Sequence, residues 1–238
     1  MIPLLLRPGR RPMFPAARQL RPRPDGLVAL GGDLQPDTIE EAYRKGVFPW
    51  DGRQPIPWYS PDPRMVLEPA RFHASHSLRK LARQERLQVR LDTRFRDVMR
   101  ACAGTPRPGQ QGTWITGGMV DGYGALHDRG VAHSVEVYED GELVGGLYGL
   151  ALGRAFFGES MFARRRDASK LALLHLCRRL VHADYAFVDC QQDTPHLRSL
   201  GAVLVSRDAY LDALDAATAV EDHWPRAAAW VDEERDAP

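Results

Sequence analysis

The stretch Tyr185-Ala186-Phe187-Val188-Asp189-Cys190-Gln191-Gln192-Asp193-Thr194 changes from apolar to polar within the length of one strand. Its first four residues are apolar, and three of them are aromatic or β-branched, which predicts a buried strand. Six polar residues then follow without a break. Polar side chains at the C-terminal end of a strand face the crevice where open α/β sheets bind ligands. The stretch therefore predicts a sheet and a candidate site at its edge.

The polar residues of this stretch divide into two groups. Asp193 or Thr194 is expected to cap a following helix, with Pro195 at its first position. Asp189 and Gln191 have no such role and are the candidate site residues. Cys190 could be a nucleophile, but no histidine is identified as its partner, so we expect a buried thiol that points away from the site.

Composition bounds the class of protein. The chain has 238 residues, 44% hydrophobic and 26% charged, which suits one principal domain with a small addition. A formal net charge of +1 argues against a bulk electrostatic nucleic-acid binder. The charge is uneven, however: the first 25 residues and residues 71–100 are rich in arginine, and the C-terminus is acidic. One side could therefore bind an anionic partner, although scattered arginines also suit a solvated surface.

Cysteine usage and apolar runs indicate the compartment. The three cysteines are widely spaced and lack a C-x-x-C pair, which favours a reducing environment. The proline-broken start does not resemble a signal peptide, and no apolar run is long enough to span a bilayer. We expect a cytoplasmic protein without contact to a membrane. P-loop, dinucleotide-binding, zinc and G-x-S-x-G patterns are missing from the sequence.

The N-terminal quarter is dominated by proline and tryptophan. Six prolines predict no regular structure in residues 1–25. A helix is predicted over 37–45, with Asp37 as its cap and Glu40 completing a capping box. Prolines alternate with aromatic residues over 47–64, which predicts a stiff extended loop. Its rings either fill a seam between domains or form a platform on which a base stacks.

A β region with a long helix follows. Alternating residues and the Asp140-Gly141 turn predict a meander, and Asp167 is expected to cap the helix. The predicted strands cover 132–138, 142–152 and 154–162, and the helix covers 168–183. Within the third strand, Glu159 lies among bulky apolar residues, where a carboxylate is costly without a cation. Its partner is either an arginine of this chain or a cationic substrate.

Nine motifs in order resemble those of the leucyl/phenylalanyl-tRNA–protein transferase family. Together they run through most of the chain, from about residue 26 to 211. They are Gly31-Gly32-Asp33-Leu34, Gly46-Val47-Phe48-Pro49-Trp50, Trp58-Tyr59-Ser60-Pro61-Asp62-Pro63-Arg64, Gly112-Thr113-Trp114-Ile115-Thr116, Ala132-His133-Ser134-Val135-Glu136-Val137, Leu143-Val144-Gly145-Gly146-Leu147-Tyr148-Gly149, Gly158-Glu159-Ser160-Met161-Phe162, Ala168-Ser169-Lys170 and Val188-Asp189-Cys190-Gln191.

The resemblance implies an α+β fold. A small N-terminal domain, residues 1–63, would pack on an acetyltransferase-like (GNAT-type) domain, residues 64–219, whose mixed sheet is flanked by helices. Residues 220–238 would form a charged tail. The order of a meander, a helix and another strand agrees with such a sheet, although this agreement is an analogy of fold.

The resemblance also implies an activity. The enzyme would move Leu or Phe from its aminoacyl-tRNA to the N-terminal Arg or Lys of a protein and mark that protein for degradation. Partners would be Leu-tRNA, Phe-tRNA and these acceptors, the protein would be a monomer, and no metal or other cofactor is implied. By position, Asp189 and Gln191 match the catalytic pair, Glu159 the residue that meets the acceptor, and Trp50 and Trp114 the residues that hold the terminal adenosine.

The chemistry of these residue types suits the reaction. An aminoacyl ester is already activated, so its aminolysis needs an aimed, neutral amine. Gln191 can accept a hydrogen bond from that amine, and Asp189, on the same face of an extended strand, could orient the amide and draw off the proton. An apolar pocket would hold the amino-acid side chain, and the basic residues 71–100 would contact tRNA phosphates. The candidate pocket residues are Leu147, Phe156, Met161 and Val188.

Two other functions are compatible with parts of the pattern. A coenzyme-A-dependent N-acetyltransferase would share the sheet order but needs a glycine-rich loop before the long helix, where this chain has Arg164-Arg165-Arg166-Asp167. A non-catalytic tRNA-binding module would explain the arginines and tryptophans, but it would not explain Asp189, Gln191 and Glu159 together.

Overall fold

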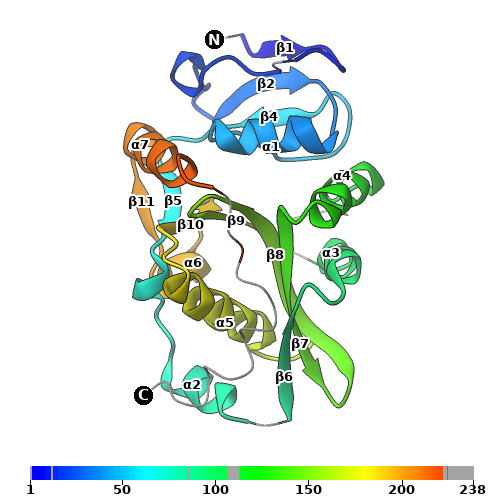
Figure 1. Ribbon diagram of the computed structural model, residues 1–238, viewed down its shortest axis with the longest axis vertical. Helices are drawn as coiled ribbons and strands as arrows, with labels where there is room; N and C mark the ends of the chain where they lie inside the picture. Colours follow the sequence, from blue (N-terminus) through cyan, green and yellow to red (C-terminus); the bar gives the residue numbers. More distant parts are fainter. Residues whose placement is uncertain (1, 12, 85, 107–112, 222–223, 225–238) are drawn as a thin grey trace.

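The strand predicted from the opening stretch is β10 (Phe187–Gln191), an inner strand of the larger of two sheets in the computed structural model (Figure 1). The structure describes all residues except 1, 12, 85, 107–112, 222–223 and 225–238. In this described part, the larger sheet has seven strands in the order β11 (Val203–Val205), β5 (Arg64–Leu67), β10, β9 (Ala155–Ala163), β8 (Glu142–Leu152), β7 (Ala132–Glu139) and β6 (Leu87–Leu91).

The sheet is mixed, since β10 and β9 are parallel and the other neighbouring pairs are antiparallel. The parallel pair arises because α5 (Ala168–His182) crosses over between β9 and β10. The predicted meander and the Asp140-Gly141 turn are confirmed, and Gly141 has the positive φ that this turn requires.

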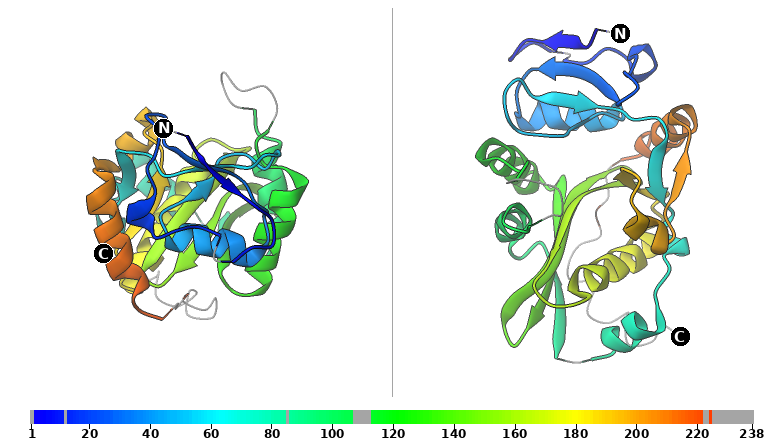
Figure 2. Two further views of the ribbon diagram at one scale, coloured as in Figure 1. Left: turned by 90° about the horizontal axis from the view of Figure 1, so that it is seen from above. Right: turned by 180° about the vertical axis from the view of Figure 1, so that it is seen from behind.

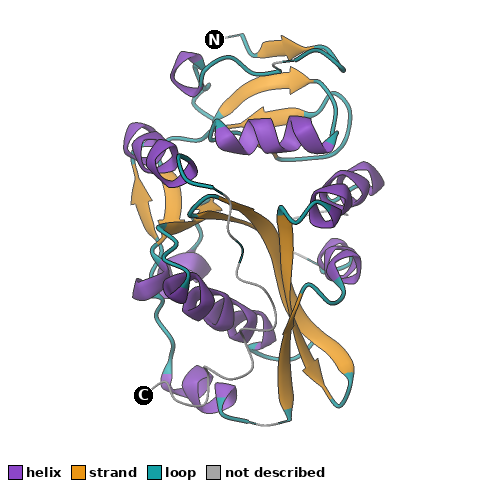
Figure 3. Cartoon of the chain, in the orientation of Figure 1, coloured by secondary structure: helices purple, strands orange, loops and turns teal. Residues whose placement is uncertain are grey.

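Helices cover both faces of the larger sheet (Figure 3). The helix α5 buries Leu171, Leu174 and Leu180 against one face, beside α2 (His76–Ala82). On the other face lie α3 (Phe95–Ala103), α4 (Gly117–Asp128) and α7 (Arg207–Thr218). The remaining short helices are η2 (Pro69–Arg71) and α6 (Pro195–Ser199). The predicted α+β class with a mixed sheet flanked by helices is confirmed.

The smaller sheet belongs to the N-terminal part of the chain. Its strands are β1 (Leu4–Leu6), β2 (Leu27–Gly31), β4 (Pro57–Tyr59) and β3 (Phe48–Pro49), in that order, and α1 (Pro36–Arg44) packs beside them. The prediction that residues 1–25 lack regular structure is wrong, because they contain β1 and the short helix η1 (Ala17–Gln19). β1 pairs with β2 at one edge of this sheet, and Pro3 and Pro8 lie outside the strand.

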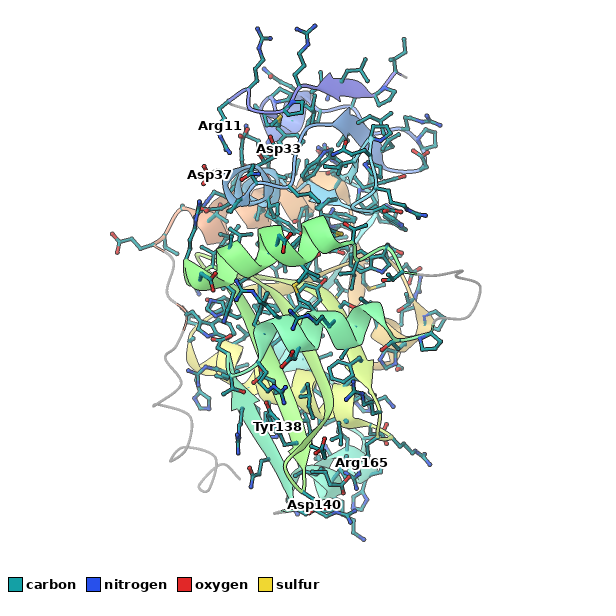
Figure 4. All side chains as sticks on the ribbon, turned by 90° about the vertical axis from the view of Figure 1, so that its right-hand side faces the viewer. Arg11, Asp33, Asp37, Tyr138, Asp140 and Arg165 are labelled. Atoms are coloured by element: carbon teal, nitrogen blue, oxygen red, sulfur yellow. The ribbon has the colours of Figure 1, made fainter. Side chains whose placement is uncertain are left out.

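Two predicted helix caps are wrong. Helix α1 begins at Pro36, so Asp37 lies inside its first turn and forms ion pairs with Arg129 and Arg11. Asp37 and Arg11 are labelled in Figure 4. Glu40 likewise bonds Arg44 instead of the helix N-terminus. Asp167 does precede α5, but it has a left-handed backbone, and its side chain accepts from Lys170 instead of capping. Both aspartates therefore form ion pairs instead of accepting hydrogen bonds from the helix N-terminus.

The smaller sheet lies over the end of the larger sheet where β10 ends, as Figures 1 and 2 show. The side chain of Arg207 joins the two parts: its Nε donates to Ser60 Oγ at 2.8 Å, and its Nη2 donates to the carbonyl oxygen of Ala17 at 2.8 Å. The polar end of β10 therefore lies where the two parts of the chain meet.

Candidate active site

The end of β10 is irregular. Val188 and Cys190 line a cavity, while Asp189 lies on the opposite face of the strand, as expected from strand alternation. Gln191 would then share the face of Asp189, but its φ is +64° and the pairing with β5 shifts register between the two residues. This turn places Gln191 on the cavity wall. The expectation that Asp189 and Gln191 share one face of an extended strand is therefore wrong.

Asp189 is buried and paired with Arg64. The side chain has no exposed area, and its carboxylate accepts from Arg64 Nε at 2.9 Å and Arg64 Nη2 at 2.7 Å. Tyr210 donates to it at 2.8 Å, and the backbone N–H of Gln191 donates to it at 2.9 Å. Asp189 does not line the cavity. It therefore contacts Gln191 through the backbone, and the expectation that it orients the amide and draws off the proton stays a prediction.

Arg64 is held as firmly as the carboxylate it pairs with. Its guanidinium lies 4.7 Å from the ring centre of Phe48 and 4.6 Å from that of Tyr210, and its Nη1 donates to the carbonyl oxygen of Gly46. Burial alone would lower the pKa of Arg64, but Asp189 raises it above its usual value, so the guanidinium stays charged. Since Phe48 also lines the cavity, this arginine connects the N-terminal part of the chain to the site.

Glu159 is surrounded by neutral donors. Gln191 Nε2 donates to Glu159 Oε1 at 2.7 Å, and the Tyr123 hydroxyl donates to Oε2 at 3.1 Å. The hydroxyls of Tyr43 and Tyr123 are 2.7 Å apart. Burial raises the pKa of Glu159 to about 7, although hydrogen bonds from Tyr43, Gln191 and Tyr123 act in the opposite direction. Within the described residues no arginine or lysine pairs with Glu159, so the predicted alternative of an internal salt bridge is not observed.

The cavity beside Glu159 is mostly apolar and has a volume of about 370 Å³. All four predicted pocket residues line it, as do Trp50, Trp114, Glu159 and Gln191. The structure thus brings together every predicted site residue except Asp189. Residues on the wall that the sequence did not indicate include Phe48, Tyr148, Leu173, Leu176, His196 and Leu197. Leu173 and Leu176 belong to the apolar face of α5 and look like ordinary core residues in sequence.

The prediction that the proline-rich run 47–64 forms only an extended loop is wrong, because it contains β3 and the inner strand β4, and its tryptophans differ in burial. Trp58 is fully buried in the N-terminal core, and its Nε1 donates to the carbonyl oxygen of Gly31 at 2.8 Å. Trp50 is 36% exposed at the cavity, with its ring centre 4.9 Å from that of Tyr59. One tryptophan therefore fills the core of the N-terminal part instead of a seam between domains, and the other lines the cavity, where stacking on a base stays a prediction.

Cys190 faces the cavity, so the expectation that its side chain points away is wrong. Burial raises the pKa of its thiol, and Asp189 adds to this shift. A thiol with a raised pKa is a poor nucleophile, because the thiolate is the reactive form. Cys190 therefore serves as part of the wall.

The short helix after β10 is capped as one of the alternatives predicted. Thr194 Oγ1 accepts from the backbone N–H of Leu197, and Pro195 begins α6. Asp193 instead pairs with Arg198, at 2.6 Å from its Nε. His196 lies on the cavity wall, and burial, followed by the charge of Lys170, lowers its pKa.

The described residues contain neither a metal-binding cluster nor a membrane-spanning helix. No three His, Cys, Asp or Glu side chains are grouped so as to hold a metal ion. No helix there has the length and apolarity needed to cross a membrane.

Family models match two parts of the chain. The model described as "Leucyl/phenylalanyl-tRNA protein transferase N-terminal domain" matches residues 32–62, and the one described as "Leucyl/phenylalanyl-tRNA protein transferase" matches residues 66–215. The second match alone covers more than half of the chain and contains Glu159, Asp189 and Gln191.

Curated relatives carry the same description. A "Leucyl/phenylalanyl-tRNA--protein transferase" of Dechloromonas aromatica (strain RCB) is 52% identical over 220 residues, which are 92% of this chain and 93% of the relative. One of Aromatoleum aromaticum is 56% identical over 203 residues, 85% of this chain and 84% of the relative.

Solved structures are more distant. A GCN5-related N-acetyltransferase from Kribbella flavida is 12% identical with a TM-score of 0.36, and the match covers 69% of this chain and 58% of that one. L-PGS from Bacillus licheniformis is 9% identical with a TM-score of 0.41, over 82% of this chain and 72% of that one.

Proposed function

The chain belongs to the leucyl/phenylalanyl-tRNA–protein transferase family, and we propose that its cavity is where the two substrates of that reaction meet. The enzyme is an aminoacyltransferase, which moves leucine or phenylalanine from aminoacyl-tRNA to a protein and marks that protein for degradation. The proposal concerns the roles of the individual residues and the nature of the acceptor.

The observation that carries the proposal is the environment of Glu159. A carboxylate inside a protein is costly unless a cation or hydrogen bonds stabilise it, and here the hydrogen-bond donors are neutral. Glu159 is only partly buried because one side lines the cavity. An acceptor with an N-terminal Arg or Lys would bring the missing positive charge. We therefore assign Glu159 as the residue that binds the basic end of the acceptor.

Gln191 would align the amine. Because its Nε2 donates to Glu159, its Oε1 is the atom left to accept a hydrogen bond from the α-amino group of the acceptor. The neutral amine attacks the ester carbonyl carbon, a C–N bond forms, and the C–O bond to the tRNA ribose breaks. The nitrogen loses a proton and the ribose oxygen gains one. Asp189 holds Gln191 in place through its backbone N–H.

The other walls suit the aminoacyl end of the tRNA. Leu147, Phe156, Met161 and Val188 would surround the leucine or phenylalanine side chain. Trp50 and Trp114 would stack on the terminal adenosine, and stacking of one base on an aromatic ring is worth about 1–3 kcal/mol. A pocket that selects by apolar shape discriminates weakly, at about 1–3 kcal/mol per methylene, which suits an enzyme that accepts two different amino acids.

The remainder of the tRNA would contact the protein elsewhere. The arginines of residues 71–100 are largely exposed, and contact with phosphates would not require base readout. Several of them already pair with carboxylates, as Arg96 does with Asp128 at 2.7 Å, so phosphates would compete with these pairs. A monomer in the cytoplasm is the state expected for this function.

The test is a transfer assay with the purified protein, radiolabelled Leu-tRNA and peptides that differ only in their first residue. We expect label on peptides that start with Arg or Lys, and none on a peptide that starts with Asp. Parallel reactions with acetyl-CoA should give no product. Equal labelling of all peptides would contradict the assigned role of Glu159, and acetylation alone would favour the N-acetyltransferase alternative.

A further inference from the structure

Trp224 packs on the larger domain although it follows α7, in the segment for which the sequence predicted only a charged tail. Its ring lies 4.1 Å from that of His133 and 5.7 Å from that of Phe156, stacked on both, and meets the edge of Tyr185 at 6.4 Å. Its Nε1 donates to Asp92 Oδ2 at 3.1 Å. Apart from residues 220, 221 and 224, the predicted tail 220–238 lies outside the described residues.

Asp92 and His133, which contact this indole, are themselves held by hydrogen bonds. Asp92 has a left-handed backbone just after β6, and its carboxylate accepts from the backbone N–H of Ser134 at 2.8 Å. His133 Nδ1 lies 2.9 Å from the same carboxylate, and Nε2 lies 3.0 Å from the carbonyl oxygen of Gly130. The imidazole plane is therefore fixed, and it presents a flat face to Trp224.

The other neighbour, Phe156, is a wall of the cavity. Its ring lies over Gly149, where a Cβ atom would come within 2.6 Å of it, so the glycine leaves the space that the ring occupies. Trp224 packs against the same ring. The Phe156 ring, which lines the cavity, is therefore in contact with an indole from beyond residues 66–215.

We propose that Trp224 is a positioning residue for amino-acid specificity: it braces Phe156 and so limits the size of the side chain that the cavity accepts. The inference rests on the proposed role of the cavity as the aminoacyl pocket. Leucine and phenylalanine differ mainly in bulk, so a cavity in which the Phe156 ring can move aside favours phenylalanine. In the wild-type enzyme Trp224 holds this ring in place and so limits the preference for phenylalanine over leucine.

The test compares kcat/KM for Phe-tRNA and Leu-tRNA with one Arg-starting peptide. In Trp224→Ala the Phe-to-Leu ratio should rise at least about threefold, a small part of the discrimination that one methylene can give. Trp224→Phe keeps a flat ring and should stay within about twofold of the wild-type ratio. Val220→Ala, an exposed position in the same segment, is the matched control and should leave the ratio unchanged.

The outcomes separate this inference from the proposed function. Thermal denaturation shows whether Trp224→Ala is folded. If the wild-type protein transfers both amino acids and the folded variant keeps the wild-type Phe-to-Leu ratio, the proposed support of Phe156 by Trp224 is contradicted. If Trp224→Ala does not fold, Trp224→Leu takes its place with the same criterion, and failure of both to fold would make Trp224 a stability residue and overturn the proposal. If wild-type protein transfers neither amino acid, the proposed function itself fails.

Discussion

Asp189 and Glu159 are two interior carboxylates that bind opposite ends of the same residue. Asp189 accepts from the backbone N–H of Gln191, and Glu159 accepts from its side-chain amide. Asp189 has a cation of its own, Arg64, and no exposed area, whereas Glu159 has neutral donors and an open cavity beside it. A carboxylate with an internal cation can stabilise structure, and one without such a cation can bind a cation from outside.

This difference assigns different tasks to two residues that look alike in sequence. On the Asp189 side the network fixes the backbone of Gln191 in a left-handed conformation that is uncommon for a residue other than glycine. On the Glu159 side the network holds the amide of Gln191 at the cavity wall. Substitutions of Asp189 or Arg64 should reduce the rate of transfer, and substitutions of Glu159 should alter the choice of acceptor.

The largest effect is expected from Asp189→Asn, which removes the charge but keeps the shape. Transfer should fall on the order of 10³-fold, mostly in kcat, because an amide cannot form the ion pair with Arg64 that fixes the acceptor oxygen for the Gln191 N–H, and the alignment of the amine is lost with it. Asp189→Ala is a harsher change, since an unpaired buried Arg64 costs about 3–5 kcal/mol. Single-turnover kinetics measure the effect, and Asp193→Asn, on the exposed pair with Arg198, is the control. A change confined to KM would argue against positioning.

A smaller loss is expected from Arg64→Lys, because lysine keeps the charge but not the two parallel hydrogen bonds to Asp189. We expect roughly 10- to 100-fold lower kcat for every acceptor tested, with little change in acceptor preference. The same kinetics apply, with Arg198→Lys as the surface control. A selective loss of activity with Arg-starting acceptors would show that Arg64 affects acceptor binding and would contradict its assignment to the positioning of Gln191.

The smallest effect concerns stability and pH. Because the pKa of Glu159 is raised to about 7 in the fold, protonation favours the folded protein. That stabilisation is complete below the ordinary pKa of glutamate, near 4.5, and is lost as the pH rises through about 7. The Tm of wild-type protein relative to Glu159→Gln should therefore rise as the pH falls from 8 to 5. A constant difference in Tm over this range would show that the pKa is not raised.

Local patterns predicted much of the fold and the site. The strand before Asp189, the meander and the turn at Asp140-Gly141 depend on neighbouring residues, and they are present as predicted. Glu159 stood out because a carboxylate among bulky apolar residues is unusual. Trp50 came from the resemblance to the family and the pocket residues from their apolar character, and the structure groups them around one cavity.

Other features depend on residues that are distant in sequence. The partner of Asp189 is Arg64, 125 residues earlier, so its enclosure could not be predicted from its own surroundings. The turn at Gln191 follows from a register shift against β5. Trp50 and Trp58 share one proline-rich run, and only the pairing of the N-terminal strands decides which of them is buried. The sequence around Trp224 did not indicate its contacts, because they are made with residues that are distant in sequence.

The central claim, that Glu159 binds the positive charge of the acceptor, is tested most directly by two peptides that start with Arg or with citrulline, its neutral isostere. Glu159→Gln should lower kcat/KM for the Arg peptide about 10- to 100-fold, the worth of a charge-assisted hydrogen bond, and that for the citrulline peptide less than about threefold. Glu136→Gln, at another interior glutamate of the sheet, controls for loss of a buried carboxylate. An equal loss with both peptides would contradict the claim.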